Sequence, residues 1–210
     1  MNAMRSLAYV KLNSLQTRLR QGPLFVPLLL GVSLPFLLIA SRLARNELGP
    51  DPAEALMHET GEWAMRFLVV VLLARPASQS QWPLLFRHRR LFGLAVFFYA
   101  SLHLLVFAQV YIAWSFAILL EELAERPYVV VGSAAWLLLL PLAVTSTDGW
   151  RRRLRQRWRR MHRLIYAVAP LVVLHTLWLA RSDLGDSLFY AVLFGLLLIW
   201  RVNPIRRALS

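Results

Sequence analysis

The sequence predicts an all-α integral membrane protein, a bundle of six transmembrane helices with the N- and C-termini in the cytoplasm. Hydrophobic residues make up 58% of the 210 residues, and mean hydropathy is +0.52. Both values lie above those of an ordinary soluble domain. Six apolar segments approach the roughly 20 residues that a helix needs to cross a bilayer. The connections between them are basic on one side and acidic on the other, which is typical of a membrane topology signal.

The six apolar segments lie between a basic N-terminal segment, residues 1–23, and a short C-terminal tail, residues 204–210. Each is expected to be helical, because a chain in lipid must satisfy its backbone polar groups internally. The second segment is the weakest, since Arg66 interrupts it. The connections are short, so residues 24–203 are expected to form one transmembrane domain. The segments are residues 24–41, 61–76, 91–113, 128–145, 163–180 and 187–203.

The positive charges give the orientation. With a cytoplasmic N-terminus, the cytoplasmic stretches 1–23, 75–90, 146–163 and 201–210 hold 4, 4, 8 and 3 of the 24 Lys and Arg residues, and four lie on the other side. Asp148 is the single cytoplasmic acid among 11 Asp and Glu residues. This bias follows the positive-inside rule.

The acidic outer loops are residues 47–62 and 121–127. By the same orientation they are expected to face the periplasm of a Gram-negative bacterium. The chain is then a multi-pass protein of the bacterial inner membrane, and the lipid bilayer is its first partner.

The arginine-rich stretch 151–160 has two interpretations. The favoured one is that the arginines keep this end of the helix in the cytoplasm and bind lipid headgroups. The alternative is a docking surface for an anionic cofactor or a cytosolic partner. The stretch lies at the membrane between two spans, so nucleic acid is not expected as a partner.

His103 and His175 are expected at the same depth in the bilayer. His103 lies 12 residues into the third segment from Leu91, or about 18 Å, and His175 lies 13 residues beyond His162, or about 20 Å. Two imidazoles at one depth on different helices can ligate the iron of a b-type haem from both sides. Such six-coordinate iron suits electron transfer. The alternative is that each histidine forms a hydrogen bond between helices.

His162 and His88 lie near the cytoplasmic boundary and could ligate a second haem; the alternative is that both are solvated. Thirteen residues place His162 and His175 about 140° apart around an ideal helix. Facing one partner helix with both therefore requires a kink or local unwinding, which Pro170 can supply. His58 is expected at the surface, with helix capping or a rival ligand role as alternatives.

Arg66 lies in the outer third of its span, where an arginine is costly and needs a partner. The partner is either a haem propionate or Glu62, four residues earlier on the same face. No catalytic residues are expected, because the sequence holds no phosphate-binding glycine loop, nucleophile elbow or HExxH motif. With no cysteine, thiolate metal sites and iron–sulfur clusters are excluded.

The sequence resembles the MsrQ (YedZ-type) family of haem-binding membrane subunits of bacterial protein-methionine-sulfoxide reductase systems. The resemblance covers most of the chain from about Pro35, and the order and spacing of its motifs agree. They are LGPDPAEALMHETGEWAMRF (48–67), RRLFGL (89–94), LHL at His103, ERPYVVVG (125–132), LAVTST (142–147), WRRMHRLIY (158–166) and LHTLW at His175.

The resemblance implies a ferric-reductase-like transmembrane domain that conducts electrons through haem b, one or two per chain. His103, His162 and His175 match the haem-associated histidines of the family, whereas His88 has no secure match. The donor would be the quinone pool or a flavin-linked reductase on the cytoplasmic side. The acceptor would be a periplasmic molybdopterin-containing MsrP-type subunit, which reduces methionine sulfoxide in oxidised proteins. FMN is a further cofactor of the family, without an assigned site here.

Two other functions stay open from the residues alone. One is a transmembrane ferric or quinone reductase that works without a partner. The other is a haem-free transporter or scaffold, which the near absence of acids within the spans disfavours.

Overall fold

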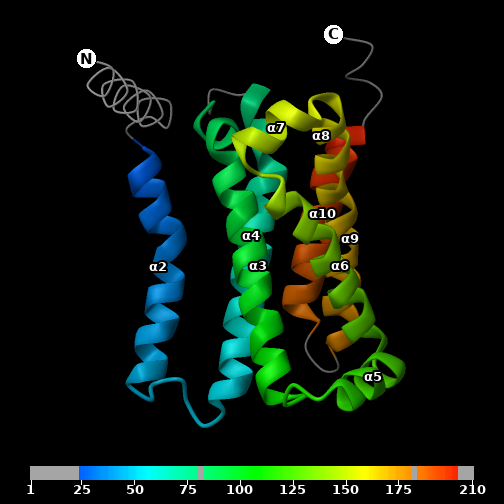
Figure 1. Cartoon of the computed structure of the whole chain (residues 1–210). Coiled ribbons are helices and arrows are strands. Elements are labelled where there is room, and N and C mark those ends of the chain that lie inside the picture. The colour runs from blue at the N-terminus through cyan, green and yellow to red at the C-terminus, as the bar shows by residue number, and fades with distance from the viewer. Residues whose placement is uncertain (1–23, 80–82, 181–183, 203–210) are drawn as a thin grey trace, which may run out of the picture. The chain divides into compact units, whose positions relative to one another are not determined.

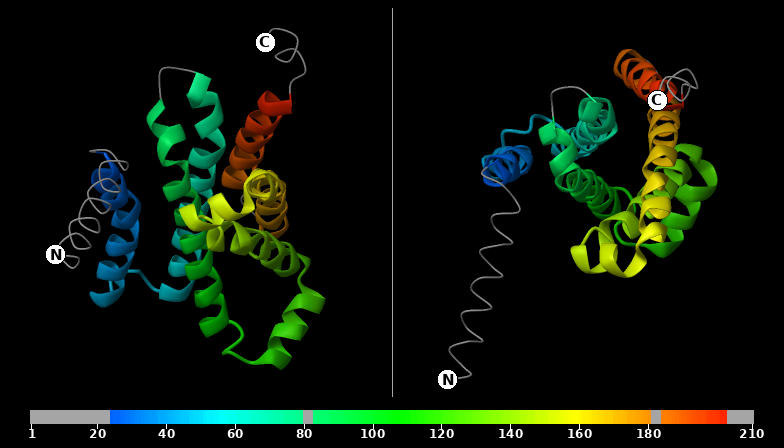
Figure 2. Two further views of the ribbon diagram at one scale, coloured as in Figure 1. Left: turned by 45° about the horizontal axis from the view of Figure 1, so that its top comes forward. Right: turned by 90° about the horizontal axis from the view of Figure 1, so that it is seen from above.

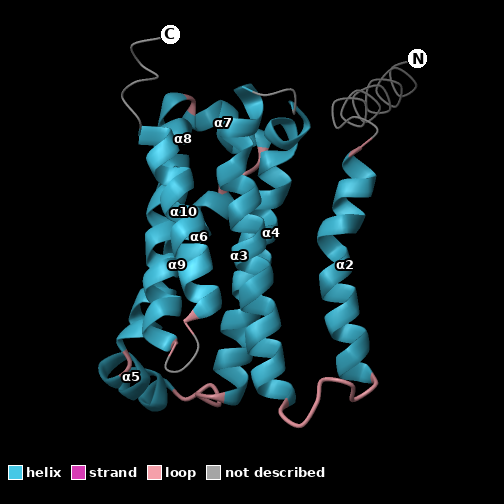
Figure 3. Ribbon diagram, turned by 180° about the vertical axis from the view of Figure 1, so that it is seen from behind, coloured by secondary structure: helices cyan, strands magenta, loops and turns pink. Residues whose placement is uncertain are grey.

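The computed structural model describes residues 24–79, 83–180 and 184–202, and these contain helices and connecting turns without a strand (Figure 3). The basic segment 1–23 and the tail 204–210 lie outside the described residues. The chain divides into two units, Met1–Ser41 and Arg42–Ser210. Helix α2 spans Phe25–Ala44 and is described by itself, and the remaining helices lie in the second unit.

The helices of the second unit follow the predicted segments and extend several of them. The helix around the second segment is longer than predicted, as is the one around the third. The predicted outer loop 121–127 is largely helical. The elements are α3 (Pro52–Gln79), α4 (Pro83–Val110), α5 (Phe116–Glu125), α6 (Pro127–Val144), α7 (Asp148–Leu154), α8 (Gln156–Met161), a 3₁₀ turn (His162–Leu164), α9 (Ile165–Leu179) and α10 (Gly185–Val202).

Polar caps and prolines begin several of these helices. The Asp51 carboxylate accepts hydrogen bonds from the backbone N–H groups of Ala53 and Glu54, at 3.0 and 2.9 Å, which satisfies two free donors at the start of α3. Ser115 and Thr147 cap α5 and α7 in the same way. Pro127 occupies the first turn of α6, where its missing N–H has no cost.

The long helices pack as two neighbouring groups. Helix α3 packs along α4, and α6 packs along α9; α10 contacts both α9 and α3, and α4 contacts α6 (Figures 1 and 2). The largest fully buried side chains, Leu68, Tyr99, Val168 and Phe194, come from α3, α4, α9 and α10. These four helices therefore share one core.

Four helices among the described residues are long and apolar enough to cross a membrane, over Phe25–Ala44, His88–Val110, Pro127–Val144 and Gln156–Leu179. Many large apolar side chains on their outer faces are exposed, as Leu137 at 59% shows, and a bilayer would cover them. The chain is thus an all-helical membrane protein. Helices α3 and α10 occupy the other two predicted segments without meeting the same length and composition, so the count of six spans stays a prediction.

The connections gather at two ends of the second unit. Helices α7 and α8 lie at one end, beside the start of α4 and the end of α10, and α5 lies at the opposite end (Figure 1). The basic stretches 83–90 and 146–163 therefore come together, and the acidic stretches 47–62 and 121–127 lie at the other end. This grouping agrees with the predicted topology; which end faces the cytoplasm stays a prediction.

An ion pair joins α4 to the first residue of α7 at the arginine-rich end. Arg90 Nη1 lies 2.6 Å from Asp148 Oδ1, and Arg90 Nη2 donates to the Ser146 carbonyl. The hydrogen bond from Arg90 lowers the pKa of the Asp148 carboxyl, and the charges of Arg90, Arg151 and Arg152 add to this. The carboxylate thus stabilises the fold above its unfolded pKa and loses this contribution as pH falls through its folded pKa.

Replacing Asp148 with asparagine is expected to lower stability slightly at pH 7, within the ~0–1 kcal/mol of exposed ion pairs. The difference from the unsubstituted protein should shrink as pH falls through the folded-state pKa of the Asp148 carboxyl, because the carboxyl is then protonated in both states. Thermal unfolding in detergent between pH 7 and pH 3 measures it. A difference that is the same at both ends of this range would assign the effect to side-chain shape instead of charge.

Candidate functional site

His103 on α4 and His175 on α9 lie together in the core of the bundle. Their ring centres are 6.2 Å apart, and the ring planes are nearly perpendicular, at 85°. Both side chains are partly buried. The two helices enter from the same end of the unit, so equal distances along them bring the rings to one level, as the sequence predicts.

Each of these histidines is held through Nδ1 by a backbone carbonyl of a neighbouring helix. His103 Nδ1 lies 2.9 Å from the Met57 carbonyl oxygen on α3, and His175 Nδ1 lies 2.7 Å from the Tyr128 carbonyl oxygen on α6. A carbonyl oxygen can accept but not donate, so Nδ1 carries a proton in both rings. In a neutral imidazole the lone pair then resides on Nε2. This arrangement is typical of histidines that bind metals, where the second nitrogen fixes the ring and its tautomer.

The spacing of the two rings fits a shared iron. A metal–imidazole nitrogen bond measures about 2 Å, and the ring centre lies about 1 Å further on, so two imidazoles on opposite sides of one metal have centres about 6 Å apart. The observed separation of 6.2 Å agrees with this value. The separation of the ring centres therefore leaves room for one metal atom between His103 and His175.

His162 has a similar anchor at the arginine-rich end. Its Nδ1 lies 3.1 Å from the Trp158 carbonyl oxygen, and its ring stacks on the Trp158 indole with centres 3.8 Å apart. Trp158 is buried, and its indole N–H donates to the Thr145 carbonyl at 2.9 Å. His162 Nε2 is buried and has no hydrogen bond of ordinary geometry among the described residues, although the Leu142 backbone also interacts with this imidazole. A buried nitrogen in this state is costly, and a metal would satisfy it.

The helix changes its winding at His162. The turn His162–Leu164 is 3₁₀, whereas Pro170 lies within α9. A 3₁₀ turn advances about 120° per residue and an α-helix about 100°. Three residues of 3₁₀ reduce the angle between His162 and His175 from about 140° to about 80°. A change in winding between the two histidines thus lies at the 3₁₀ turn, and a further kink at Pro170 stays a prediction.

The structure also places the two remaining candidate residues, His88 and Arg66. His88 is buried at the start of α4, so it is not the solvated histidine of the alternative interpretation. Arg66 forms an ion pair with Glu62 at 2.5 Å, and its guanidinium lies 4.7 Å from the Trp63 ring centre. The alternative, that Arg66 binds a haem propionate, stays a prediction.

His58 is exposed on α3, as predicted. Its nearest ligand atoms belong to Glu62 and Asp186, all within 4.8 Å of one another. These three side chains lie at the acidic end, and Glu62 is already paired with Arg66. His58 is therefore separate from the His103–His175 pair.

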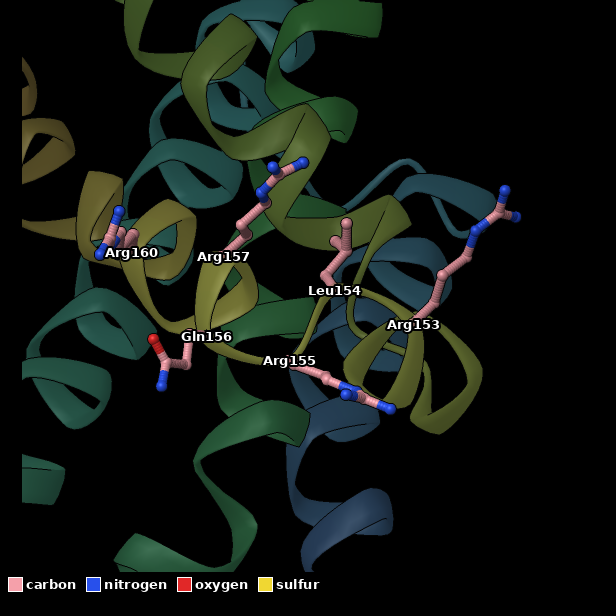
Figure 4. Close-up of a pocket in the computed structure, with 6 residues that line it drawn as sticks. All are labelled: Arg153, Leu154, Arg155, Gln156, Arg157 and Arg160. Atoms are coloured by element: carbon pink, nitrogen blue, oxygen red, sulfur yellow. The ribbon is translucent and has the colours of Figure 1, made fainter.

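The arginine-rich stretch surrounds a hollow of about 510 Å³ at the junction of α7 and α8. Arg155 has a positive φ of 48° there, which ends one helix and starts the next. The guanidinium groups around the hollow end at separate places and do not converge on one point (Figure 4). Guanidinium groups that do not converge suit contacts with separate lipid headgroups, and this role stays a prediction. The hollow is lined by Arg153, Leu154, Arg155, Gln156, Arg157 and Arg160.

Sequence reasoning did not identify the groups that hold the three histidines. The Met57 and Tyr128 carbonyls carry no residue-type signal, because every residue has one. Trp158 had a signal that could have been used, since it lies four residues before His162 and so on the same helix face.

The comparisons with known proteins identify the family of the chain. The family described as ferric reductase like transmembrane component matches residues 60–173, a range that includes His103 and His162 and ends two residues before His175. The chain is 46% identical over 158 residues to the protein-methionine-sulfoxide reductase heme-binding subunit MsrQ of Xanthomonas euvesicatoria pv. vesicatoria (strain 85-10), covering 75% of this chain and 72% of that protein.

MsrQ of Caulobacter vibrioides (strain ATCC 19089 / CIP 103742 / CB 15) is 39% identical over 178 residues, which are 84% of this chain and 85% of that one. No solved structure matches the chain. The alignments with both relatives extend over most of the chain, and the family match spans the helices that carry the candidate site. The chain therefore belongs to the MsrQ family and contains a ferric reductase like transmembrane component.

Proposed function

We propose that this chain is a haem b electron-transfer subunit in the bacterial inner membrane. The observation that carries the proposal is the facing pair His103 and His175, each fixed through Nδ1 and 6.2 Å apart. The relatives named above are described as heme-binding subunits of a methionine sulfoxide reductase, which supports the same cofactor here. Haem would supply a one-electron carrier, and His103 and His175 would hold it through their Nε2 atoms.

His103 and His175 hold the haem nearer the acidic end, and His162 holds a second haem at the arginine-rich end. The burial of His162 Nε2, which forms no hydrogen bond of ordinary geometry within the described part of the chain, supports this second site, and His88, buried at the same end, is its candidate second ligand. Two sites at different depths give electrons a path across the membrane. Arg66 is the candidate partner for a haem propionate.

Electrons enter at the arginine-rich end, on the cytoplasmic side, from the quinone pool or a flavin-linked reductase. They leave at the acidic end for a periplasmic MsrP-type molybdopterin subunit. The chain itself carries no catalytic site for methionine sulfoxide, and FMN remains a cofactor without assigned residues. Ligation by two histidines leaves no open position on the iron for a substrate. Such an iron is sufficient here because the partner subunit carries out the reaction.

The test is purification in mild detergent followed by optical and electron paramagnetic resonance spectra. Reduced protein should show a b-type α-band, and addition of the oxidised periplasmic partner should remove it. Because the His103 and His175 planes are nearly perpendicular, the oxidised protein should give a highly anisotropic low-spin signal. A colourless preparation that binds its partner would contradict the proposal and favour a scaffold. Full ferric or quinone reductase activity without the partner would favour the standalone enzyme.

Charge reversal at the acidic end should impair electron delivery. Glu47 and Glu54 are exposed there, and Asp51 is excluded from the design because it caps α3. The double variant Glu47→Lys, Glu54→Lys is expected to slow partner-dependent reoxidation about tenfold or more at low salt, because electrostatic attraction speeds encounter. Haem content should be unchanged. Stopped-flow reoxidation measures the rate, and an unchanged rate would remove this surface from the interface.

A further inference from the structure

Two glycines lie directly against the rings of the facing histidines. A Cβ atom added to Gly132 on α6 would lie 2.8 Å from His175 Nδ1 and 2.9 Å from its Cε1. A Cβ atom added to Gly61 on α3 would lie 3.1 Å from His103 Nδ1 and 3.3 Å from its Cε1. The first contact is closer than real Cβ atoms adopt, and the second is tight. Neither ring could keep its place beside an ordinary residue without a shift.

Each glycine lies at the same distance in sequence from the residue whose carbonyl accepts the hydrogen bond of the histidine. Gly61 follows Met57 by four residues, and Gly132 follows Tyr128 by four residues. In an α-helix, the carbonyl of residue i points towards residue i+4. A side chain at i+4 would therefore stand beside the carbonyl at the place from which the imidazole N–H approaches. Because glycine has no side chain, the imidazole can reach the carbonyl oxygen. That oxygen can then accept a hydrogen bond within its own helix and another from the histidine.

We propose that Gly61 and Gly132 are positioning residues, which let α3 and α6 hold His103 and His175 by Nδ1 so that Nε2 is presented to the iron. The device occurs twice, on different helix pairs, with the same spacing of carbonyl and glycine. The inference rests on the proposed haem ligation. It assigns a role to the backbone of α3 and α6, although neither helix contributes a ligand to this iron.

The first experiment compares four glycine-to-alanine variants by haem content and spectra. Gly132→Ala is expected to weaken haem retention about 10- to 100-fold, the usual effect of disturbing a group that orients a metal ligand. Gly61→Ala should have a smaller effect, since its contact is longer. Gly93→Ala in α4 and Gly195→Ala in α10 are matched controls, because an added Cβ there meets nothing within 4 Å. They should behave like the unsubstituted protein, as alanine is favoured inside helices.

The second experiment uses haem-free protein, so that it does not depend on the cofactor. Gly132→Ala should lower the thermal unfolding midpoint when His175 is present and leave it unchanged in a His175→Ala background, where no ring remains to be displaced. The difference between the two shifts in the unfolding midpoint measures the coupling between Gly132 and His175. ¹⁵N NMR of labelled histidine should also show the Nδ1–H tautomer of His175 and its loss in Gly132→Ala.

The outcomes separate the two proposals. An unsubstituted protein that binds no haem removes the ligation proposal, and a His175-dependent effect of Gly132→Ala in haem-free protein would then still support the glycine's contact with the ring. A haem protein in which Gly132→Ala matches Gly195→Ala in haem content, spectra and unfolding overturns the inference and leaves the ligation intact. An equal loss with and without His175 also overturns it, because the glycine would then serve helix packing alone.

Discussion

Replacing His103 or His175 with alanine should abolish the low-spin haem that the two residues share. Each supplies one of two axial ligands, so neither variant can form a six-coordinate centre. We expect haem affinity at this site to fall more than about 100-fold, since loss of even an orienting group costs 10- to 100-fold. The double variant should be no worse than either single one, because residues that act as a unit are not additive. Pyridine haemochrome assays and optical spectra measure the loss.

His58→Ala is the matched control, since His58 is exposed on α3 and lies apart from the pair. Its haem content should equal that of the unsubstituted protein. A His175→Gly variant should regain a low-spin spectrum when imidazole is added to the buffer, which separates loss of a ligand from loss of fold. Survival of the full α-band in the double variant would contradict the ligation, and the two histidines would then be hydrogen-bonding groups between helices.

The pairing of His103 with His175 could be predicted because helix rise converts sequence distance directly into depth. Each helix enters from the same side, and 12 and 13 residues differ by about 1.5 Å in depth. No packing information is needed for this step. The helix positions were predictable for a similar reason, as an apolar segment in lipid has few alternatives to a helix.

What depth cannot provide is the angle of a residue around its helix. That angle depends on every local change in winding, and the 3₁₀ turn at His162–Leu164 has no glycine or proline to reveal it. Pro170 offered a visible signal for a kink, whereas the tighter 3₁₀ winding lies six residues or more before it. Helix α5 was missed for another reason: its charged residues Glu121, Glu122 and Glu125 suggested a loop, whereas its Ser115 cap and apolar first turns favour a helix.

The anchors of the histidines lay outside prediction because they are backbone groups. The Tyr128 carbonyl can bind His175 because Gly132, which lies beside this carbonyl, has no side chain. The motifs MHETG and PYVVVG both contain this spacing. Their common feature could be recognised once the structure placed a histidine against each.

Replacing His162 with alanine should remove the haem population at the arginine-rich end and leave the population held by His103 and His175. Its Nε2 is buried and, among the described residues, forms no hydrogen bond of ordinary geometry, while Nδ1 and the ring face are engaged by Trp158. We expect haem per chain to fall to about half, with the highly anisotropic low-spin signal retained, because the two sites use different helix levels. Electron entry should fail, so quinol-driven reduction of the remaining haem should slow at least about tenfold.

The reason for this slowing is distance along the path. Without the second site, electrons from the arginine-rich end must reach the His103–His175 level, about 20 Å further along α9, in one step. Chemical reduction with a small reductant should be unaffected, which makes it the control within the same sample. His88→Ala provides a second comparison, and loss of the same spectral component would make His88 the other ligand. Unchanged haem stoichiometry in His162→Ala would contradict a second haem and leave His162 as the group that stacks on Trp158 and fixes the 3₁₀ turn.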